Sequence, residues 1–373
     1  MPGVHKKIVV LPGDGIGPEV TSAATQVLQD CAEAFGHRFE LLSHAFGGVA
    51  IDTFGTPLPK ETLAACRAAD ATLLGAVGGP KWEVLPLEQR PEAGLLGIRR
   101  GLGLFINLRP LRLRESLRRI SPLHLERIAH CDFEIVRELA GDIYFGRHET
   151  TVENGVEVAR DEAVYSVPEV ERVAKYAFER AVARRGHLTS VDKHNILATS
   201  VLWRKTVVAM APQYPTVTLD HQYVDNASMQ LVLRPEQFDV ILTSNMFGDI
   251  LSDEAAALAG SIGLIPSMSM GNTTKGALYE PIHGSAPALT GKDAANPLGT
   301  IFSVCMMLRE SFGLRTEADW IERGVDRVLD RGLRTADIAD DPKQIVPSSV
   351  FLEQLRKELS ENLRPTEQHG WGV

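Results

Sequence analysis

Apolar runs alternate with amphipathic stretches along most of this 373-residue chain. Residues 7–11 (KIVVL) have the pattern of a buried strand, and residues 18–35 place apolar side chains on one helical face before Gly36 ends the pattern. We predict further strands at 71–79, 133–139, 188–193, 216–225 and 238–245, and further helices at 61–69, 168–186 and 196–211. Strands that alternate with helices indicate an α/β fold with a mainly parallel sheet.

Size and charge limit the class of protein. A chain of this length exceeds one ordinary hydrophobic core, so we expect two domains. The formal net charge of −9 argues against nucleic acid and against an anionic membrane as the main partner. No run approaches a membrane-spanning length, and the N-terminus lacks a signal-peptide pattern. The cysteines, Cys31, Cys66, Cys131 and Cys305, have no metal-binding spacing, and a cytoplasmic protein is expected.

The glycine-rich segment GDGIG, residues 13–17, stands between the first predicted strand and the first predicted helix. It is similar to a dinucleotide-binding loop, but Pro18 follows at once, where the Rossmann fingerprint continues toward a third glycine. A tight turn from strand to helix explains the glycines at least as well.

Three arginines, Arg99, Arg109 and Arg137, stand near the ends of predicted strands. A guanidinium matches a carboxylate with two parallel hydrogen bonds, so three of them in an acidic protein favour a small dicarboxylate ligand. The alternative is structural ion pairing, which for Arg137 means Glu134 or Glu138 in the same strand.

Tyr144 and Lys193 are candidates for proton transfer, each with a plainer alternative. Tyr144 stands between Ile143 and Phe145, as a core tyrosine bonded to the backbone would. Lys193 follows a predicted strand at the end where open parallel sheets bind ligands, and a lysine there with a lowered pKa would transfer protons. From this segment alone, a surface lysine is favoured.

Asp249 and Asp253 lie four positions apart in NMFGDILSDEAA, an otherwise apolar and small stretch. If a helix begins near Phe247, the two carboxylates share one face and repel. A divalent cation would turn the repulsion into binding, and all-oxygen ligands suit Mg²⁺ or Mn²⁺. The alternative is a helix cap and a solvated acid. Asp225, which closes HQYVD at another predicted strand end, is a candidate third carboxylate.

Nine motifs occur in one order along the chain: VLPGDGIGPEV, GGPKW, RPEAGLL, NLRP, VREL with DIYFG, VDKHN, HQYVD, NMFGDILSDEAA, and LYEPIHGSAPALTGKDAANP. Together they resemble the β-decarboxylating dehydrogenases of 2-hydroxy acids, which act on isopropylmalate, isocitrate, homoisocitrate or tartrate. The match runs from about residue 8 to at least residue 311. The family's α/β fold is the isocitrate/isopropylmalate dehydrogenase-like two-domain fold, which differs from the Rossmann fold.

The resemblance implies a domain organisation and a dimer. Residues 1–104 and 259–373 would form the first, cofactor-side domain. Residues 105–258 would form the second, with the dimer interface and the metal and catalytic residues. The family works as a homodimer with shared active sites, in which Lys193 and Asp225 enter from the neighbouring subunit.

The resemblance also implies roles for individual residues. The catalytic pair would be Tyr144 and Lys193, and the metal ligands would be Asp225, Asp249 and Asp253. The substrate would be bound by Glu92, Leu95, Leu96, Arg99, Arg109, Arg137, Asn195, Ile196 and Asp225. The cofactor would be bound by Ile16, Gly79, Glu92, Glu280, His283, Gly284, Ser285, Ala286, Ala288, Leu289 and Asn296.

RPEAGLL is similar to the isopropylmalate branch, in which Leu95 and Leu96 would form an apolar wall. The favoured reaction is oxidative decarboxylation of (2R,3S)-3-isopropylmalate to 4-methyl-2-oxopentanoate with NAD and Mg²⁺ or Mn²⁺, in leucine biosynthesis. Another 3-substituted malate, such as 3-benzylmalate, or tartrate is the alternative, because one methylene changes discrimination by only about 1–3 kcal/mol. A non-catalytic regulatory subunit is disfavoured, since the whole catalytic set is present.

Three positions depart from the family pattern. Ala288 stands where the NAD-dependent members have an aspartate that bonds the adenosine ribose, so NADP stays open beside NAD. His194 stands where small residues are usual. Asp142 replaces a glycine usual in isopropylmalate enzymes, although isocitrate enzymes have an acid there.

Overall fold

The computed structural model describes residues 3–361, and the chain divides into two units. Unit 1 contains residues up to 102, residues 114–120 and residues from 260 onward. Unit 2 contains residues 103–113 and 121–259. The boundaries expected from the sequence place 114–120 in the inserted segment, whereas the structure groups them with unit 1. There Arg114 pairs with Glu322 at 3.5 Å and stacks 4.0 Å above the Phe302 ring.

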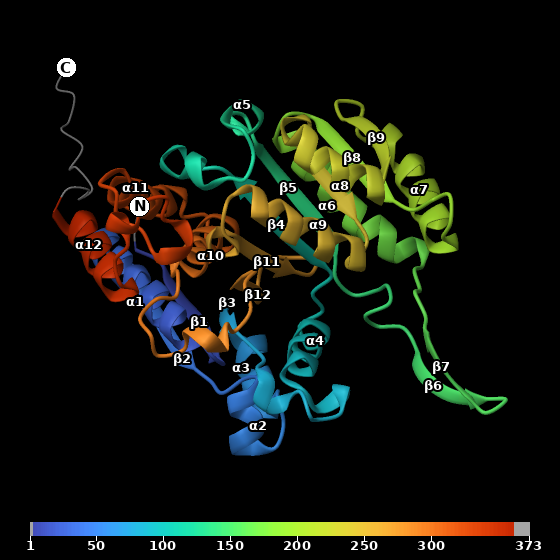
Figure 1. Cartoon of the computed structure of the whole chain (residues 1–373), viewed down its shortest axis with the longest axis horizontal. Helices are drawn as coiled ribbons and strands as arrows, with labels where there is room; N and C mark the ends of the chain where they lie inside the picture. Colours follow the sequence, from blue (N-terminus) through green and yellow to red (C-terminus); the bar gives the residue numbers. More distant parts are fainter. Residues whose placement is uncertain (1–2, 362–373) are drawn as a thin grey trace. The chain divides into compact units, whose positions relative to one another are not determined.

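Unit 1 is built on strands β1 (His5–Gly13), β2 (Arg38–Ser43), β3 (Ala71–Ala76), β11 (Pro266–Met270) and β12 (Ala277–Pro281). Their order in the sheet is β2-β1-β3-β12-β11, parallel except for the last pair. Its helices are α1 (Gly17–Phe35), α2 (Gly48–Phe54), α3 (Lys60–Ala68), α4 (Pro91–Gly101), α10 (Leu298–Met306), α11 (Arg315–Asp330) and α12 (Ser348–Glu361) (Figure 1).

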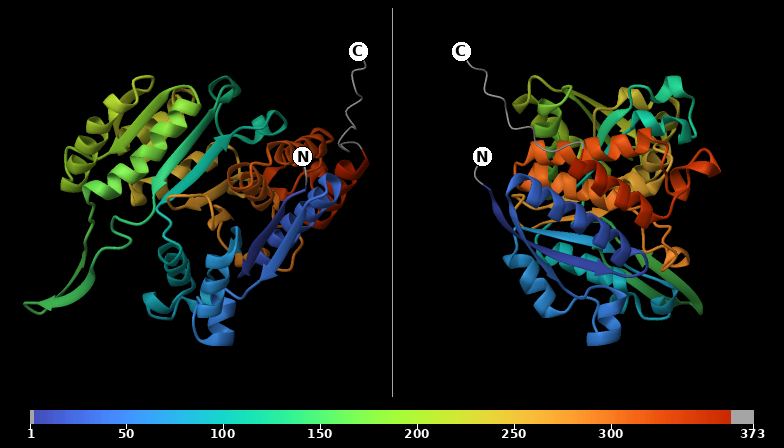
Figure 2. Two further views of the ribbon diagram at one scale, coloured as in Figure 1. Left: turned by 180° about the vertical axis from the view of Figure 1, so that it is seen from behind. Right: turned by 90° about the vertical axis from the view of Figure 1, so that its left-hand side faces the viewer.

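Unit 2 is built on strands β4 (Ile106–Arg112), β5 (Asp132–Glu138), β8 (His187–Asp192), β9 (Thr218–Tyr223) and β10 (Val240–Thr243). Their order is β4-β5-β10-β8-β9, with β4 antiparallel to β5 and the others parallel. Its helices are α5 (Leu125–Ile128), α6 (Val167–Ala183), α7 (Ala198–Met210), α8 (Val224–Leu233) and α9 (Asn245–Leu258). Strands β6 (His148–Glu153) and β7 (Val156–Asp161) form a separate hairpin that extends from this unit (Figure 2).

Helix α6 illustrates how the sequence determines these elements. Ser166 and Glu169 form a reciprocal capping box at its start, and Pro168 occupies the first turn. Val170, Val173 and Ala177 fall on one face and are buried. Strands covered by helices on both faces are typically continuous apolar runs in sequence. The predicted α/β fold with a mainly parallel sheet is confirmed.

Arg99 lies in the last turn of α4, and its side chain reaches Glu280 near the end of β12. One expectation at the residue level is wrong. Asp225 lies in the first turn of α8, because β9 already ends at Tyr223. A carboxylate is favourable at that position, where helix N–H groups lack partners. None of the helices in the described part of the chain is long and apolar enough to cross a membrane.

Candidate active site

Asp249 and Asp253 lie on one face of α9, as their spacing predicts. The helix begins at Asn245, two residues before the expected start, with Ser244 as its N-cap residue. The adjoining face is buried and contains Gly248, at which a Cβ would lie 2.6 Å from Cγ of Arg137. Only glycine at this position lets the stem of Arg137 pass directly over the helix.

Arg137 is buried in β5 and reaches α9. Its Nη1 donates to Asp249, and its Nε and Nη2 donate to Oδ1 of Asn245 at 3.0 and 2.7 Å. The alternative, a structural ion pair with Glu134 or Glu138, does not fit the strand geometry, because both residues lie an odd number of positions from Arg137 and point to the other face of β5. Glu134 instead accepts from Arg180 at 2.8 Å, and Glu138 pairs with Arg172 at 3.5 Å.

Arg109 lies on the same face as Arg137, because Asn107 stands opposite Arg137 in the antiparallel register and Arg109 follows two residues later. Its Nε donates to Oδ1 of Asn107 at 2.8 Å. Its Nη1 donates to Oγ of Ser252 at 2.6 Å and to Oδ1 of Asp253 at 3.2 Å. The two arginines thus offset the repulsion between the carboxylates of α9.

Tyr144 completes this cluster from the turn after β5. Its hydroxyl donates to Oδ2 of Asp249 at 2.5 Å, so its partner is a carboxylate and not the backbone. Burial, followed by the hydrogen bond to Asp249, raises the pKa of Tyr144 above its usual value of 10.0. The phenol is therefore protonated at neutral pH.

Lys193 and Asp225 form a second pair in unit 2. Lys193 follows β8 directly, at the carboxyl end of the strand as predicted, and its Nζ donates to Oδ1 of Asp225 at 2.6 Å. This hydrogen bond holds the pKa of Asp225 below its usual value of 3.8. Asn195 and Ile196 follow in an exposed turn, where the Ile196 N–H donates to the Lys193 carbonyl at 2.9 Å.

The donor set of α9 fits a hard divalent cation, because two carboxylates on one face supply only oxygen ligands. Within residues 3–361, however, no three His, Cys, Asp or Glu side chains gather closely enough to hold a metal ion. The structure thus brings Asp249 and Asp253 together but does not bring Asp225 of the same chain to them.

In unit 1, Arg99 and the segment around Glu92 lie near the ends of β12 and β3. Nη2 of the buried Arg99 donates to Oε1 of Glu280 at 3.0 Å. A Cβ on Gly78 would lie 2.6 Å from Oε1 of Glu92, which places that carboxylate against the glycine turn before Gly79. Leu95 and Leu96 are half-buried on α4.

The glycine loop GDGIG packs against the segment after β12. The Ile16 N–H donates to the Ser285 carbonyl at 2.9 Å, and a Cβ on Gly15 would lie 2.0 Å from that oxygen. Ile16 packs with Val20 and Ala295, and Ala286 covers them. The loop is therefore a close backbone contact, and nothing in its geometry requires a dinucleotide.

The segment 282–296 contains most of the residues expected at the cofactor. His283 is partly buried, which lowers its pKa below the usual 6.5, and its Nδ1 donates to the Gly284 carbonyl at 2.9 Å. Asn296 donates from Nδ2 to Asp337 at 2.9 Å. Gly284, Ala288 and Leu289 are exposed on this segment.

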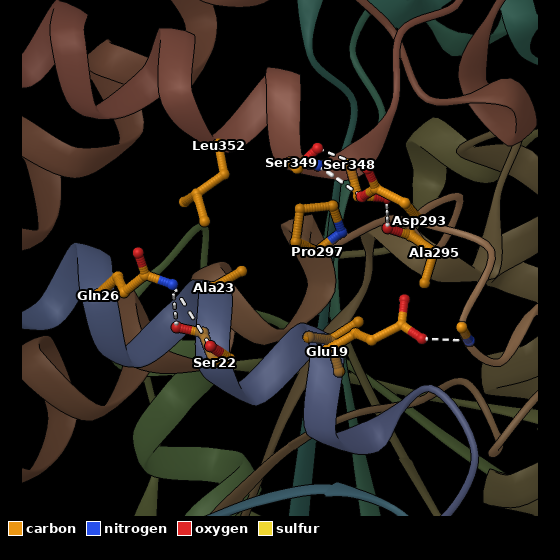
Figure 3. Close-up of a pocket in the computed structure, with 12 residues that line it drawn as sticks. Glu19, Ser22, Ala23, Gln26, Asp293, Ala295, Pro297, Ser348, Ser349 and Leu352 are labelled. Atoms are coloured by element: carbon orange, nitrogen blue, oxygen red, sulfur yellow. Dashed lines mark hydrogen bonds between the residues drawn. The ribbon is translucent and has the colours of Figure 1, made fainter.

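Helices α1 and α12 support the same segment from one side, around a cavity of about 330 Å³ (Figure 3). The Gly291 N–H donates to Oε1 of Glu19 at 2.6 Å. The Ser349 N–H donates to Oδ1 of Asp293 at 2.8 Å, at the start of α12. The exposed face of the loop is thus presented on a fixed backbone.

Sequence reasoning missed three residues of the arginine and aspartate cluster in unit 2: Asn107, Asn245 and Ser252. The first two are fully or almost fully buried and orient an arginine each. The available signal was a polar amide inside an apolar run, in FINLRP and in ILTSNMF, because a buried amide requires partners.

Comparison with known proteins gives a consistent result. The family model for isocitrate/isopropylmalate dehydrogenase matches residues 7–355. The 3-isopropylmalate dehydrogenase of Bacillus licheniformis is 54% identical over 349 residues, covering 93% of this chain and 94% of the relative. That of Bacillus subtilis is 51% identical, covering 96% and 99%. The crystal structure of isocitrate dehydrogenase from Methylococcus capsulatus is 33% identical, with a TM-score of 0.84 and coverage of 95% and 99%.

Proposed function

The chain belongs to the isocitrate/isopropylmalate dehydrogenase family, and from this premise we propose that it oxidises and decarboxylates (2R,3S)-3-isopropylmalate to 4-methyl-2-oxopentanoate. The hydride acceptor is NAD, and the reaction belongs to leucine biosynthesis. The observation that carries the substrate assignment is the identity of 51–54% with two relatives named 3-isopropylmalate dehydrogenase, over nearly their whole length. The isocitrate dehydrogenase is more distant, at 33%.

The arginines bind and orient the substrate. Arg99, Arg109 and Arg137 bind its carboxylates, for which a guanidinium supplies paired donors in a fixed plane. Arg109 and Arg137 already donate to asparagine side chains, so the planes of their guanidinium groups are fixed before the substrate arrives. Positioning of this kind leaves the proton transfers to other groups.

Two groups move protons. Lys193 accepts the proton of the substrate 2-hydroxyl as the hydride leaves C2. The resulting 2-oxo acid loses its β-carboxylate as CO₂. The electron pair of the broken C–C bond stays with C3, the carbon to which the carboxylate was attached. Tyr144 donates a proton to this carbon, a role supported by the position of its hydroxyl, which lies against Asp249 in the cluster with Arg137.

We assign a Mg²⁺ or Mn²⁺ site to Asp249 and Asp253, with Asp225 of a second copy as the third carboxylate. When bound, the cation supplies Lewis-acid polarisation of the oxygen on C2. The assignment is supported by the all-oxygen donor set of α9 and by the separation of Asp225 from it within one chain.

The separation of Asp225 from Asp249 and Asp253 within one chain also supports a homodimer, in which a second copy supplies Asp225. Exposed apolar side chains recur on α8 at Met229, Val232 and Leu233, and on α9 at Met246 and Ile250. This spacing places each set on one helix face, and such faces are typical of subunit contacts. We assign Lys193 and Asp225 to the active site of the neighbouring subunit. A cytoplasmic location stays a prediction.

NAD is assigned to the segment 282–296, with Ile16, Gly79 and Glu92 beside it. Ala288 removes the acid that would repel a 2′-phosphate, and the neighbouring Leu289 supplies no positive charge to attract one. We therefore expect NAD to be preferred by a narrower margin than in a relative with aspartate at this position.

Steady-state kinetics test the assignment. Purified enzyme with Mg²⁺ is assayed on 3-isopropylmalate, 3-benzylmalate, isocitrate and tartrate, with NAD and NADP in parallel. The expected result is the highest kcat/KM for 3-isopropylmalate with NAD, by about tenfold or more over malates of different 3-substituent, which is the discrimination an apolar pocket provides. A preference for 3-benzylmalate would support the alternative substrate, and a preference for isocitrate would refute both.

A further inference from the structure

The turn that contains Tyr144 is held by the buried carboxylate of Glu138 at the end of β5. Its oxygens accept the N–H groups of Ala140 at 2.9 Å and Gly141 at 2.8 Å. A third donor is the hydroxyl of Tyr165, at 3.1 Å. A Cβ on Gly141 would lie 2.6 Å from the Tyr165 ring, so the ring packs directly on the turn.

The same hydroxyl reaches the first residue of α9. The Asn245 N–H donates to it at 2.9 Å, so Tyr165 bridges the end of β5 and the start of the helix. This N–H is one of the donors that a helix start leaves without an internal partner. Burial raises the pKa of Tyr165 well above 10.0, which keeps the hydroxyl able to donate and accept at once.

Asn245 extends the connection to the arginine. Its Nδ2 donates to the Gly141 carbonyl at 3.1 Å, while its Oδ1 accepts from Arg137. Arg137 in turn donates to Asp249, the hydrogen-bond partner of Tyr144. A continuous set of hydrogen bonds therefore joins the turn, the helix start and the residues assigned to chemistry.

Asp142 fastens the turn to α9 a second time. Its φ of 68° lies in the left-handed region, which aspartate, asparagine and glycine tolerate best. Its Oδ1 accepts the N–H of Ile143 at 2.9 Å, and its Oδ2 accepts the N–H of Met246 in the first turn of α9 at 3.0 Å. The position thus requires both an unusual backbone and a side-chain acceptor.

We propose that Tyr165 and Asp142 are positioning residues that fix the Tyr144 hydroxyl against Asp249. Neither reaches the reacting atoms; both act by holding the turn on the start of α9. The inference rests on the proposed function, in which Tyr144 returns a proton to carbon. Displacing a catalytic group by about 1 Å costs up to about 100-fold in rate, so the loss is expected in kcat.

The first test removes one hydroxyl. Tyr165→Phe keeps the ring and is expected to lower kcat by about 10–100-fold, the usual effect of losing a group that orients an active-site residue. The KM for NAD is expected to stay within about twofold, because the cofactor segment is untouched. Tyr214→Phe is the matched control: that ring stacks on Phe178 at 4.6 Å, away from the turn, and the variant should match the wild type.

The second test separates backbone from acceptor at Asp142. Asp142→Asn tolerates the backbone and keeps one acceptor oxygen, which can still accept the Met246 N–H while the Ile143 N–H loses its partner, so kcat should fall less than in Asp142→Gly. Asp142→Gly relieves the backbone but removes the acceptor, and kcat should fall by about tenfold or more. If the role of Asp142 were purely structural, Asp142→Asn and Asp142→Gly would both have a lower Tm than the wild type. Their kcat/KM for NAD would then equal that of the wild type.

A spectroscopic readout does not depend on turnover. With ¹³C-labelled tyrosine, the Cζ resonance of Tyr144, assigned through Tyr144→Phe, should shift in Tyr165→Phe and stay in place in Tyr214→Phe. Unchanged kcat and an unmoved resonance in Tyr165→Phe would overturn the positioning role. A wild type inactive on every 3-substituted malate would overturn the proposed function alone, and the resonance would still decide the positioning role.

Discussion

His283, in the segment 282–296 to which we assign NAD, shows at the residue scale how partial burial makes the stability of the protein depend on pH. Burial lowers its pKa below the usual 6.5, so the folded protein favours the neutral imidazole. Above pH 6.5 the imidazole is neutral in both folded and unfolded chains and no penalty arises. As the pH falls below 6.5, the imidazole of the unfolded chain is protonated first. The free energy of unfolding therefore decreases until the pH reaches the lower pKa of the folded protein.

We therefore predict that His283→Gln makes stability less sensitive to acid. Between about pH 7.5 and about pH 5.5, the wild type should lose more in Tm than the variant, because the variant has no imidazole to protonate at this position. Differential scanning calorimetry at both pH values measures the difference. His130→Gln is the control, since His130 is exposed. Equal Tm losses in all three proteins would contradict the prediction.

Individual partners are the part of the site that sequence alone predicts least. The i,i+4 spacing of Asp249 and Asp253 correctly predicts their shared helix face, because a helix has a fixed period. For Arg137 the alternative of an ion pair with Glu134 or Glu138 fails, because these acids point to the other face of the strand. Its partner Asn245 is 108 residues away, and only the tertiary fold brings the two together.

Helix α9 is the element on which most of unit 2's candidate residues meet. Its close contact with β5 depends on Gly248, over which the Arg137 stem passes. Glycine in a helix interior costs roughly 0.5–1 kcal/mol relative to alanine. The helix therefore retains a weak helix former at the position where the arginine needs the space.

We predict that Gly248→Ala destabilises the protein despite the gain in helix propensity. The added methyl would lie 2.6 Å from Cγ of Arg137 and 2.7 Å from its Cβ, so the arginine or the helix must move. Overpacking of this kind typically costs about 1–3 kcal/mol, measurable by urea unfolding. Gly97→Ala in α4 is the control, because its methyl would meet only the flexible Leu58 side chain at 3.2 Å. A Gly248→Ala variant as stable as the wild type would contradict the close contact.

Elements were easier to predict from the sequence than their ends. Long amphipathic or apolar runs gave α6, β5 and β8 because their periods of burial are regular. The end of β9 was placed two residues late, since Val224 and Asp225 fit either a strand or a first helical turn. Such boundaries depend on hydrogen bonds of single residues, which leave little trace in a pattern.

At the scale of the whole molecule, the sequence indicated the fold class but not the full division of the chain. Residues 114–120 lie inside a segment expected to be contiguous, yet they group with unit 1. Ion pairs such as that of Arg114 with Glu322 join residues far apart in sequence, and no local pattern encodes them. The assembly of the site depends on such long-range contacts even more strongly.

The proposed shared active site makes a quantitative prediction about mixed dimers. Lys193→Ala and Asp249→Asn should each abolish most activity as homodimers, since every site lacks one essential group. In a mixed dimer, one site takes Asp249 from the first subunit and Lys193 from the second, and both are intact. Random reassociation of equal amounts makes about half of the dimers mixed, each with one of two sites restored, so about a quarter of wild-type activity should return.

The control pairs two variants of the same half-site. Asp249→Asn mixed with Asp253→Asn should recover nothing, because both residues come from one subunit and the same half of each site stays damaged. If Lys193→Ala with Asp249→Asn also recovers nothing, although size-exclusion chromatography of tagged chains shows that mixed dimers form, then each chain completes its own site. That result would contradict the assignment of Lys193 and Asp225 to the neighbouring subunit, and Asp225 would have to reach Asp249 within one chain.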